Sequence, residues 1–124
     1  MIDYNALAQV VDTTWGRSST PHAATFSVKV ALIGPDNISV SYAALVNFGT
    51  ERQMIEMKQM YAKESESVVA AQVADLKSRY KELTGKTVKV KEISTDDSVE
   101  MTGFNAMNAR RQAYYRRKTL FEVS

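Results

Sequence analysis

The sequence predicts an α+β domain in which an antiparallel sheet of about four to five strands packs against one long helix. Two patterns lead to this fold class. Apolar and polar residues alternate on both sides of a Gly-Pro-Asp-Asn turn, and a helical period then extends from Thr50 to about Thr84. Alternation returns after Gly85. We therefore treat residues 1–124 as one domain with a helix at 3–15, a hairpin at 25–48, a long helix at 50–84 and strands within 87–123.

The first element is a short amphipathic helix over residues 3–15. Its apolar residues recur at helical spacing on one face, namely Tyr4, Leu7, Ala8, Val11 and Trp15. Asp3 is a suitable N-cap, and Gly16 can end the helix in a left-handed conformation. The composition of residues 17–24 predicts a loop.

A β-hairpin follows the loop. The first strand places its apolar residues at every second position, namely Phe26, Val28, Val30 and Leu32. The second strand does the same over a longer stretch, with Ile38, Val40, Tyr42, Ala44, Val46 and Phe48. The Gly34–Asn37 segment between them has the residues that tight turns favour.

The long helix carries an apolar seam in two parts. The second part has 4-3-4-3 spacing and consists of Val69, Val73, Leu76, Tyr80 and Leu83, while Met54, Met57 and Tyr61 form a similar seam earlier. The segment Lys63–Ser67 between them has no apolar residue. Either one helix of about 50 Å has a polar middle, or two helices meet near Ser65; we favour one helix, kinked or stuttered. Thr50 and Gln53 are placed for a capping box, and Gly85 for the helix end.

A helix of this length extends beyond strands of about 6–10 residues, which span roughly 20–35 Å. Part of its apolar seam would be uncovered in a monomer, so we expect self-association. The expected interface consists of Met54, Met57, Met60, Tyr61, Val69, Val73, Leu76 and Tyr80. For the methionines, packing against the sheet of the same chain is the alternative, because methionine fills irregular gaps.

Strand patterns resume after the helix. Thr87–Lys91 alternates, Ser94–Ser98 predicts a turn that includes Asp96 and Asp97, and Val99–Met101 resumes the alternation. Residues 112–123 are read as a final strand, with a helix over 109–117 as the alternative because Ala, Arg and Gln favour helices. The paired aspartates are typical of a turn, and a cation site is the less favoured interpretation.

The end of the chain is basic and aromatic. The segment Ala109–Val123 combines five cations with Glu122, and its possible contact residues are Arg110, Arg111, Tyr114, Tyr115, Arg116, Arg117 and Lys118. Such a segment is typical of nucleic-acid binding. However, strand alternation would place Arg116 and Lys118 opposite Arg117 and divide the two tyrosines between faces. We therefore expect a charged strand at a subunit boundary, with nucleic acid as the alternative partner.

Catalytic, metal-binding and cofactor-binding motifs are not apparent. The chain has no cysteine, and its single histidine, His22, lies in the predicted loop without a carboxylate close in sequence. Gly85-Lys86-Thr87 does not complete a phosphate-binding loop, because Tyr80 stands where that motif requires glycine. No signal peptide and no apolar run of about 20 residues are present. We expect a non-enzymatic protein without a cofactor or a membrane partner.

The order of elements resembles that of small virion proteins of tailed bacteriophages, such as tail, neck or head-completion components. The resemblance covers the strand Ile38–Phe48, the helix Thr50–Thr84 and the hairpin-like end Val99–Val123. It implies a structural or assembly role through association with copies of the same chain or with other protein subunits, and a location in the virion or in host cytoplasm. It contains no motif that would assign a role to an individual residue.

Overall fold

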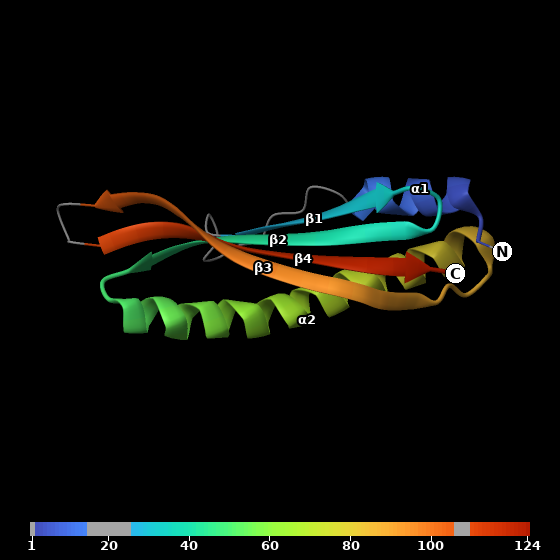
Figure 1. Ribbon diagram of the computed structural model, residues 1–124. Helices are drawn as coiled ribbons and strands as arrows, with labels where there is room; N and C mark the ends of the chain where they lie inside the picture. The colour runs from blue at the N-terminus through green and yellow to red at the C-terminus, as the bar shows by residue number, and fades with distance from the viewer. Residues whose placement is uncertain (1, 15–25, 106–109) are drawn as a thin grey trace.

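The computed structural model describes residues 2–14, 26–105 and 110–124. Its elements, in chain order, are α1 (Tyr4–Thr14), β1 (Phe26–Ile33), β2 (Asn37–Phe48), α2 (Glu51–Thr84), β3 (Val90–Asn105) and β4 (Arg110–Val123). The predicted α+β class, with a short first helix and one long helix beside an antiparallel sheet, is confirmed (Figure 1). The loop expected at 17–24, with Gly16 and His22, lies outside the described residues.

The sheet has the strand order β1-β2-β4-β3, and every neighbouring pair is antiparallel. The basic strand β4 is therefore interior, with Ile38 of β2 opposite Phe121 and Val90 of β3 opposite Val123. A boundary with another subunit at this strand, as the sequence predicts, cannot depend on edge pairing, because hydrogen bonds to β2 and β3 use both of its edges. Among the described residues, β1 and β3 are the strands with one neighbour each.

The turn predicted at Ser94–Ser98 is also wrong. These residues lie within β3, where Asp96 is opposite Lys118 and Asp97 is opposite Arg117. Aspartate is unfavourable in strands when considered alone. Here two carboxylates face two cations across the strand pair, and this cross-strand attraction compensates for the low local preference.

Two irregularities in β3 change which side its residues face. The register with β4 shifts between Glu92 and Ser94 and again between Met101 and Gly103, so Ile93 and Thr102 are extra residues. A β-bulge of this kind bends the strand and reverses the alternation that follows it. Simple even–odd alternation therefore cannot be carried through the whole of β3.

The helix α2 is continuous for 34 residues and crosses the polar segment Lys63–Ser67 without a break. Ser65 is fully buried there, and its hydroxyl donates a hydrogen bond to the Ala62 carbonyl at 2.7 Å. Both predicted ends are confirmed. Thr50 and Gln53 form a reciprocal capping box, and Gly85 has a φ of 74°, a left-handed conformation that favours glycine.

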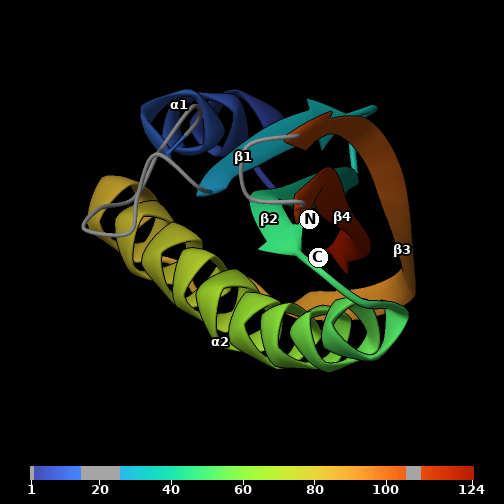
Figure 2. The same ribbon diagram turned by 90° about the vertical axis from the view of Figure 1, so that its left-hand side faces the viewer.

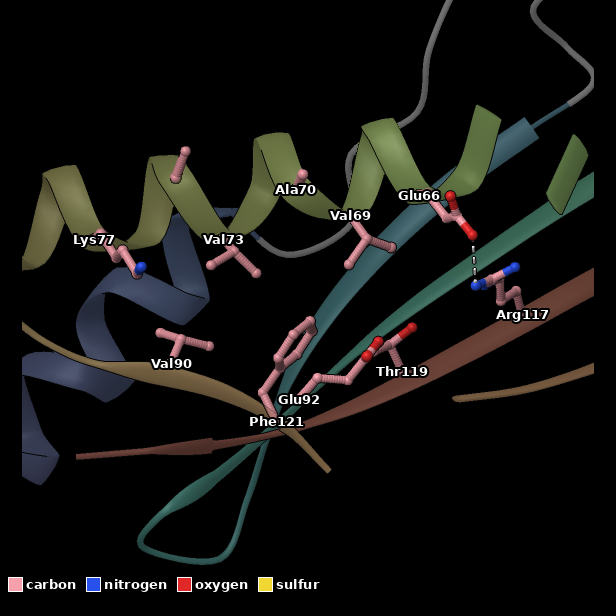
Figure 3. A pocket seen from close by; sticks show the side chains of 11 residues that line it. Glu66, Val69, Ala70, Val73, Lys77, Val90, Glu92, Arg117, Thr119 and Phe121 are labelled. Atoms are coloured by element: carbon pink, nitrogen blue, oxygen red, sulfur yellow. Dashed lines mark hydrogen bonds and ion pairs between the residues drawn. The ribbon is translucent and has the colours of Figure 1, made fainter. Parts of the chain in front are cut away.

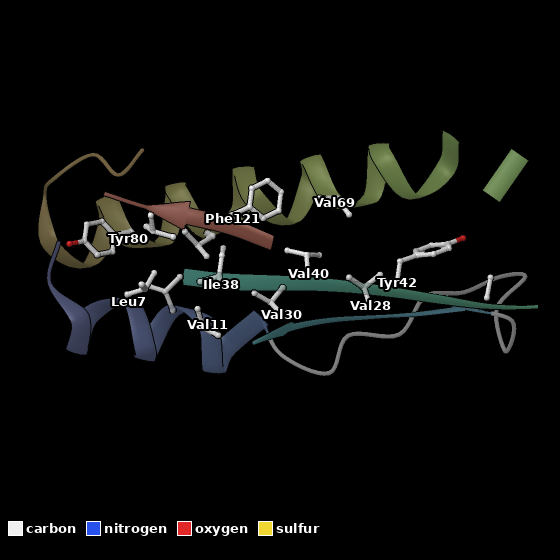
Figure 4. Close-up of a cluster of buried hydrophobic side chains, with 14 of the residues drawn as sticks. Leu7, Val11, Val28, Val30, Ile38, Val40, Tyr42, Val69, Tyr80 and Phe121 are labelled. Atoms are coloured by element: carbon white, nitrogen blue, oxygen red, sulfur yellow. The ribbon is translucent and has the colours of Figure 1, made fainter. Parts of the chain in front are cut away.

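Both helices contribute to one core. The helix α2 packs on β2 and β4, while α1 packs on β1 and on α2, so both helices cover the same side of the sheet (Figure 2). We call this the α2 side and the opposite one the outer side. Buried side chains of both helices, among them Leu7 and Val69, belong to one cluster with those of the strands (Figure 4). Tyr80 links the two helices, because its hydroxyl accepts a hydrogen bond from the Asp3 backbone nitrogen at 2.8 Å. The Asp3 side chain also caps α1, as predicted, by accepting from the Ala6 nitrogen.

Candidate functional site

The basic residues of β4 are divided between the two sides of the sheet. Tyr115 is 1% exposed and belongs to the core on the α2 side. Strand alternation places Arg117 on the same side, and places Tyr114, Arg116 and Lys118 on the outer side. The sequence predicts that the cations and tyrosines are divided between the two sides, and the alternating burial along β4 confirms this.

On the α2 side, Arg117 is held by the helix. Its guanidinium lies 3.4 Å from the Glu66 carboxylate and donates a hydrogen bond to the Ala62 carbonyl, also at 3.4 Å. The Arg117 side chain is only 16% exposed, whereas that of Glu66 is 66% exposed. Arg117 therefore fastens β4 to the middle of α2, which is a structural role.

On the outer side, Arg116 has two neighbours within β3 and β4. Its guanidinium lies 3.5 Å from the Glu100 carboxylate and 5.0 Å from the centre of the Tyr114 ring. A cation over an aromatic face at this distance contributes about 0.5–1 kcal/mol at an exposed site. The same ring face is the surface on which a nucleic-acid base would stack, so Arg116 would compete with that contact.

The charges of β3 and β4 are complementary. β4 carries five cations and one carboxylate, whereas β3 carries one cation and four carboxylates. Exposed ion pairs typically contribute less than about 1 kcal/mol each, so their value here is mainly in strand register. The basic segment is therefore largely balanced within its own sheet, and its charge count overstates the positive potential that a partner would meet.

A group of buried tyrosines lies beneath the middle of α2. The rings of Tyr42 and Tyr115 meet edge to face with centres 6.2 Å apart, and the Tyr115 hydroxyl donates to Asp97 at 3.2 Å. Burial raises the pKa of Tyr42, and nearby Glu64 adds to this. The pKa of Tyr61 is raised by the same two causes. Burial also raises the pKa of Tyr115, against an opposing hydrogen bond with Arg117. Burial therefore opposes ionisation of these three hydroxyls.

A groove of about 440 Å³ runs between α2 and the neighbouring strands β4 and β3 (Figure 3). Its walls are chiefly apolar, with Glu66 and Lys77 towards its two ends on the helix; the remaining lining residues are Val69, Ala70, Val73, Ala74, Val90, Glu92, Arg117, Thr119 and Phe121. The groove lies beside the contacts of α2 with β2 and β4, on the side of the border strand β3, which α2 reaches through Lys58 at 4.0 Å from the Asp97 carboxylate. The sequence did not predict this groove. The only available signal was the 4-3-4 spacing of Glu66, Ala70, Val73 and Lys77.

The residues of the expected interface separate into three groups. Val69, Leu76 and Tyr80 are buried in the core, so their assignment to an intermolecular surface is corrected. Met54, Met57, Tyr61 and Val73 are partly buried and pack against that core. Met60 is 52% exposed and remains on the surface. The seam therefore joins α2 mainly to its own sheet and to α1, because β2 and β4 are long enough to lie beneath most of it.

Other large apolar side chains are exposed on the two longest elements. They are Ile55, Met60 and Leu83 on α2 and Ile93, Met101 and Phe104 on β3. Phe104 is the most exposed of them, at 64%, and lies opposite Arg111 near the start of β4. Arg110 and Arg111, the remaining cations of the basic segment, are exposed at this end of the sheet.

Within residues 2–14, 26–105 and 110–124, no three histidine, aspartate or glutamate side chains gather where they could hold a metal ion. In the same part of the chain, neither helix has the length and apolar character needed to cross a membrane.

The chain matches no protein-family model, and comparisons with curated proteins and with solved structures also give no match.

Proposed function

We propose that this protein is a non-enzymatic structural subunit that acts by self-association. The observation that carries the proposal is the exposure of large apolar side chains along both α2 and β3. Each of these six residues is between 49% and 64% exposed, and a partner that covers them would remove apolar surface from water.

The assembly we propose is the virion of a tailed bacteriophage. Support comes from the resemblance in element order, since one long helix beside a small antiparallel sheet is the layout expected of such subunits. Small capsid or tail genes beside the gene for this chain would support the assignment. A neighbourhood of unrelated metabolic genes would count against it.

Self-association is tested directly by the molar mass in solution. We expect sedimentation velocity and light scattering to report a dimer or larger assembly at micromolar concentrations, with a mass that rises with concentration. A protein that stays monomeric at all concentrations up to about a hundred micromolar would contradict the proposal. A dissociation constant of that size corresponds to a binding free energy of about −5.5 kcal/mol, which is a weak complex.

Nucleic-acid binding is the second candidate, and one arrangement favours it. On the outer side, Ser41 of β2 is opposite Lys29 of β1 and also opposite Lys118 of β4. The two lysines therefore lie on either side of Ser41 in one line across the sheet. Arg116 and Tyr114 follow on the same side of β4. A cationic sheet surface with an aromatic ring is the kind of surface that single strands bind.

Retention of single-stranded DNA on the immobilised protein distinguishes the two candidates. Binding through the outer side predicts retention at low salt that weakens steeply as salt rises, and that falls in the double variant R116A/K118A. The matched control is K81A/K86A, which removes two exposed lysines from the end of α2 and the segment after it. Absence of retention at low salt would remove this candidate.

A further inference from the structure

Within the described chain, the flank of α2 towards β3 is open along the groove, although Lys58 nearer the start of the helix lies 4.0 Å from Asp97 of β3. The helix packs on β2 and β4, and α1 covers its other flank. The flank towards β3 carries Glu66, Ala70, Val73 and Lys77, which line the groove (Figure 3). We call these four residues the flank stripe. Ala70 and Lys77 are exposed, Val73 is partly exposed and the Glu66 side chain is 66% exposed, so the stripe is accessible.

The flank stripe has a chemical symmetry. The midpoint between Glu66 and Lys77 falls between Ala71 and Gln72. The midpoint between Ala70 and Val73 falls at the same place. If a second copy of α2 runs antiparallel about that point, Glu66 of one chain meets Lys77 of the other. Ala70 then meets Val73. An acid faces a base and a small side chain faces a large one, and the two-fold symmetry makes each contact occur twice.

We infer that the groove beside α2 is the surface at which two copies of this chain form a symmetric dimer, with their α2 helices antiparallel. This inference rests on the proposed self-association and names one surface for it, separate from the six exposed apolar side chains described above. The 4-3-4 spacing of the stripe is that of helices that cross at about 20°. Alanine at position 70 leaves space for the approach of the partner helix to about 8–10 Å.

Charge distribution favours this surface over the open border of the sheet. Antiparallel pairing of β3 with its own copy about the middle of the strand would bring the Asp96–Asp97 segments of both chains together. Like charges opposite one another destabilise strand pairing. Carboxylates at a border strand are a known protection against such pairing. The flank stripe has no like-charge contact at its centre, so self-association is more favourable there.

The packing of the dimer is tested with one pair of variants. Ala70→Arg introduces a long side chain at an exposed position of the stripe, where arginine maintains the helix but keeps the partner away. The matched control, Ala71→Arg, changes the neighbouring exposed residue, which does not line the groove. We expect A70R to dimerise at least about a hundredfold more weakly than the wild type, while A71R dimerises normally. Circular dichroism should show both folded.

The orientation is tested by charge reversal. Glu66→Lys and Lys77→Glu each place two like-charge pairs in a dimer of identical chains, and we expect association about tenfold weaker in each. Mixing the two variants should restore it, because the mixed dimer has opposite charges at both contacts. The control Glu82→Lys reverses an exposed charge away from the groove and should have no effect. Since Glu66→Lys also removes a partner of Arg117, thermal unfolding should confirm that it is folded.

Each result has one meaning. Weakening by A70R alone, with recovery on mixing E66K and K77E, supports the antiparallel dimer. Unchanged association of A70R, or no recovery on mixing folded variants, overturns the inference while the proposed self-association stands on another surface. A monomeric wild type overturns both.

Discussion

At the scale of single residues, the methionines of α2 differ in what surrounds them. Met57 is partly buried and packs against the core, whereas Met60 is 52% exposed. We expect Met57→Glu to lower the free energy of unfolding by about 1–3 kcal/mol, because it places a charge against apolar side chains. Met60→Glu should change it by less than about 0.5 kcal/mol. Urea unfolding of the two variants checks the difference, and equal losses would contradict the assignment of Met57 to the core.

The buried tyrosines predict a response to alkaline pH. Burial raises the pKa of Tyr42 in the folded chain above the ordinary value of 10.0. Above pH 10 the unfolded chain loses this proton first, so the folded state holds more protons and stability falls as pH rises. Below pH 10 the contribution is fully present. We expect the melting temperature to fall above pH 10 and to fall less steeply in Tyr42→Phe.

Melting curves between pH 8 and 11 check this expectation, with Tyr4→Phe as the control because Tyr4 is 44% exposed. If Tyr42→Phe and Tyr4→Phe follow the wild type with identical slopes, Tyr42 does not supply the alkaline sensitivity.

The side of the sheet that each β4 residue faces was predictable at the residue scale. Alternation correctly separates Tyr115 from Arg116, because a strand places neighbours on opposite sides whatever lies beyond.

At the scale of elements, the ends of α2 were predictable because they depend on local chemistry. Gly85 ends the helix with a φ of 74°, and its backbone nitrogen donates to the Lys81 carbonyl at 2.7 Å. An added Cβ at Gly85 would meet no other atom within 4 Å, so a substitution acts on the backbone and not through a clash. We expect Gly85→Ala to destabilise the fold by about 1 kcal/mol, which thermal unfolding can measure. A gain in stability would contradict this account of the helix end.

The middle of β3 was not predictable from its own residues. Ser94–Ser98 has the composition of a turn, and it is a strand because it pairs with β4, where Asp96 is opposite Lys118 and Asp97 is opposite Arg117. Two bulges then alter the side that each residue faces. Both features depend on a partner strand that follows later in the chain, so no local pattern identifies them.

At the scale of the whole molecule, the basic end of the chain is a structural part of the sheet. β4 lies between β2 and β3 and supplies Ala113, Tyr115, Phe121 and Val123 to the core. Removal of residues 110–124 should therefore unfold the protein, because β3 loses its only described neighbour and the core loses four buried side chains. We expect circular dichroism and thermal melting to show no cooperative transition. A folded oligomer after this truncation would contradict the interior position of β4.

Residue pattern alone was sufficient for the α+β class, the first hairpin, the limits of the long helix, and the division of the basic strand between two sides. These features follow from periodicity and end-capping, which act between residues close along the chain. The three-dimensional arrangement was needed to show that the long helix is continuous, that β4 is interior, that Ser94–Ser98 continues β3, that Leu76 and Tyr80 belong to the core, and that a groove remains beside α2. Each of these depends on which distant segments become neighbours, and strand order and helix placement are set by the packing of the whole core.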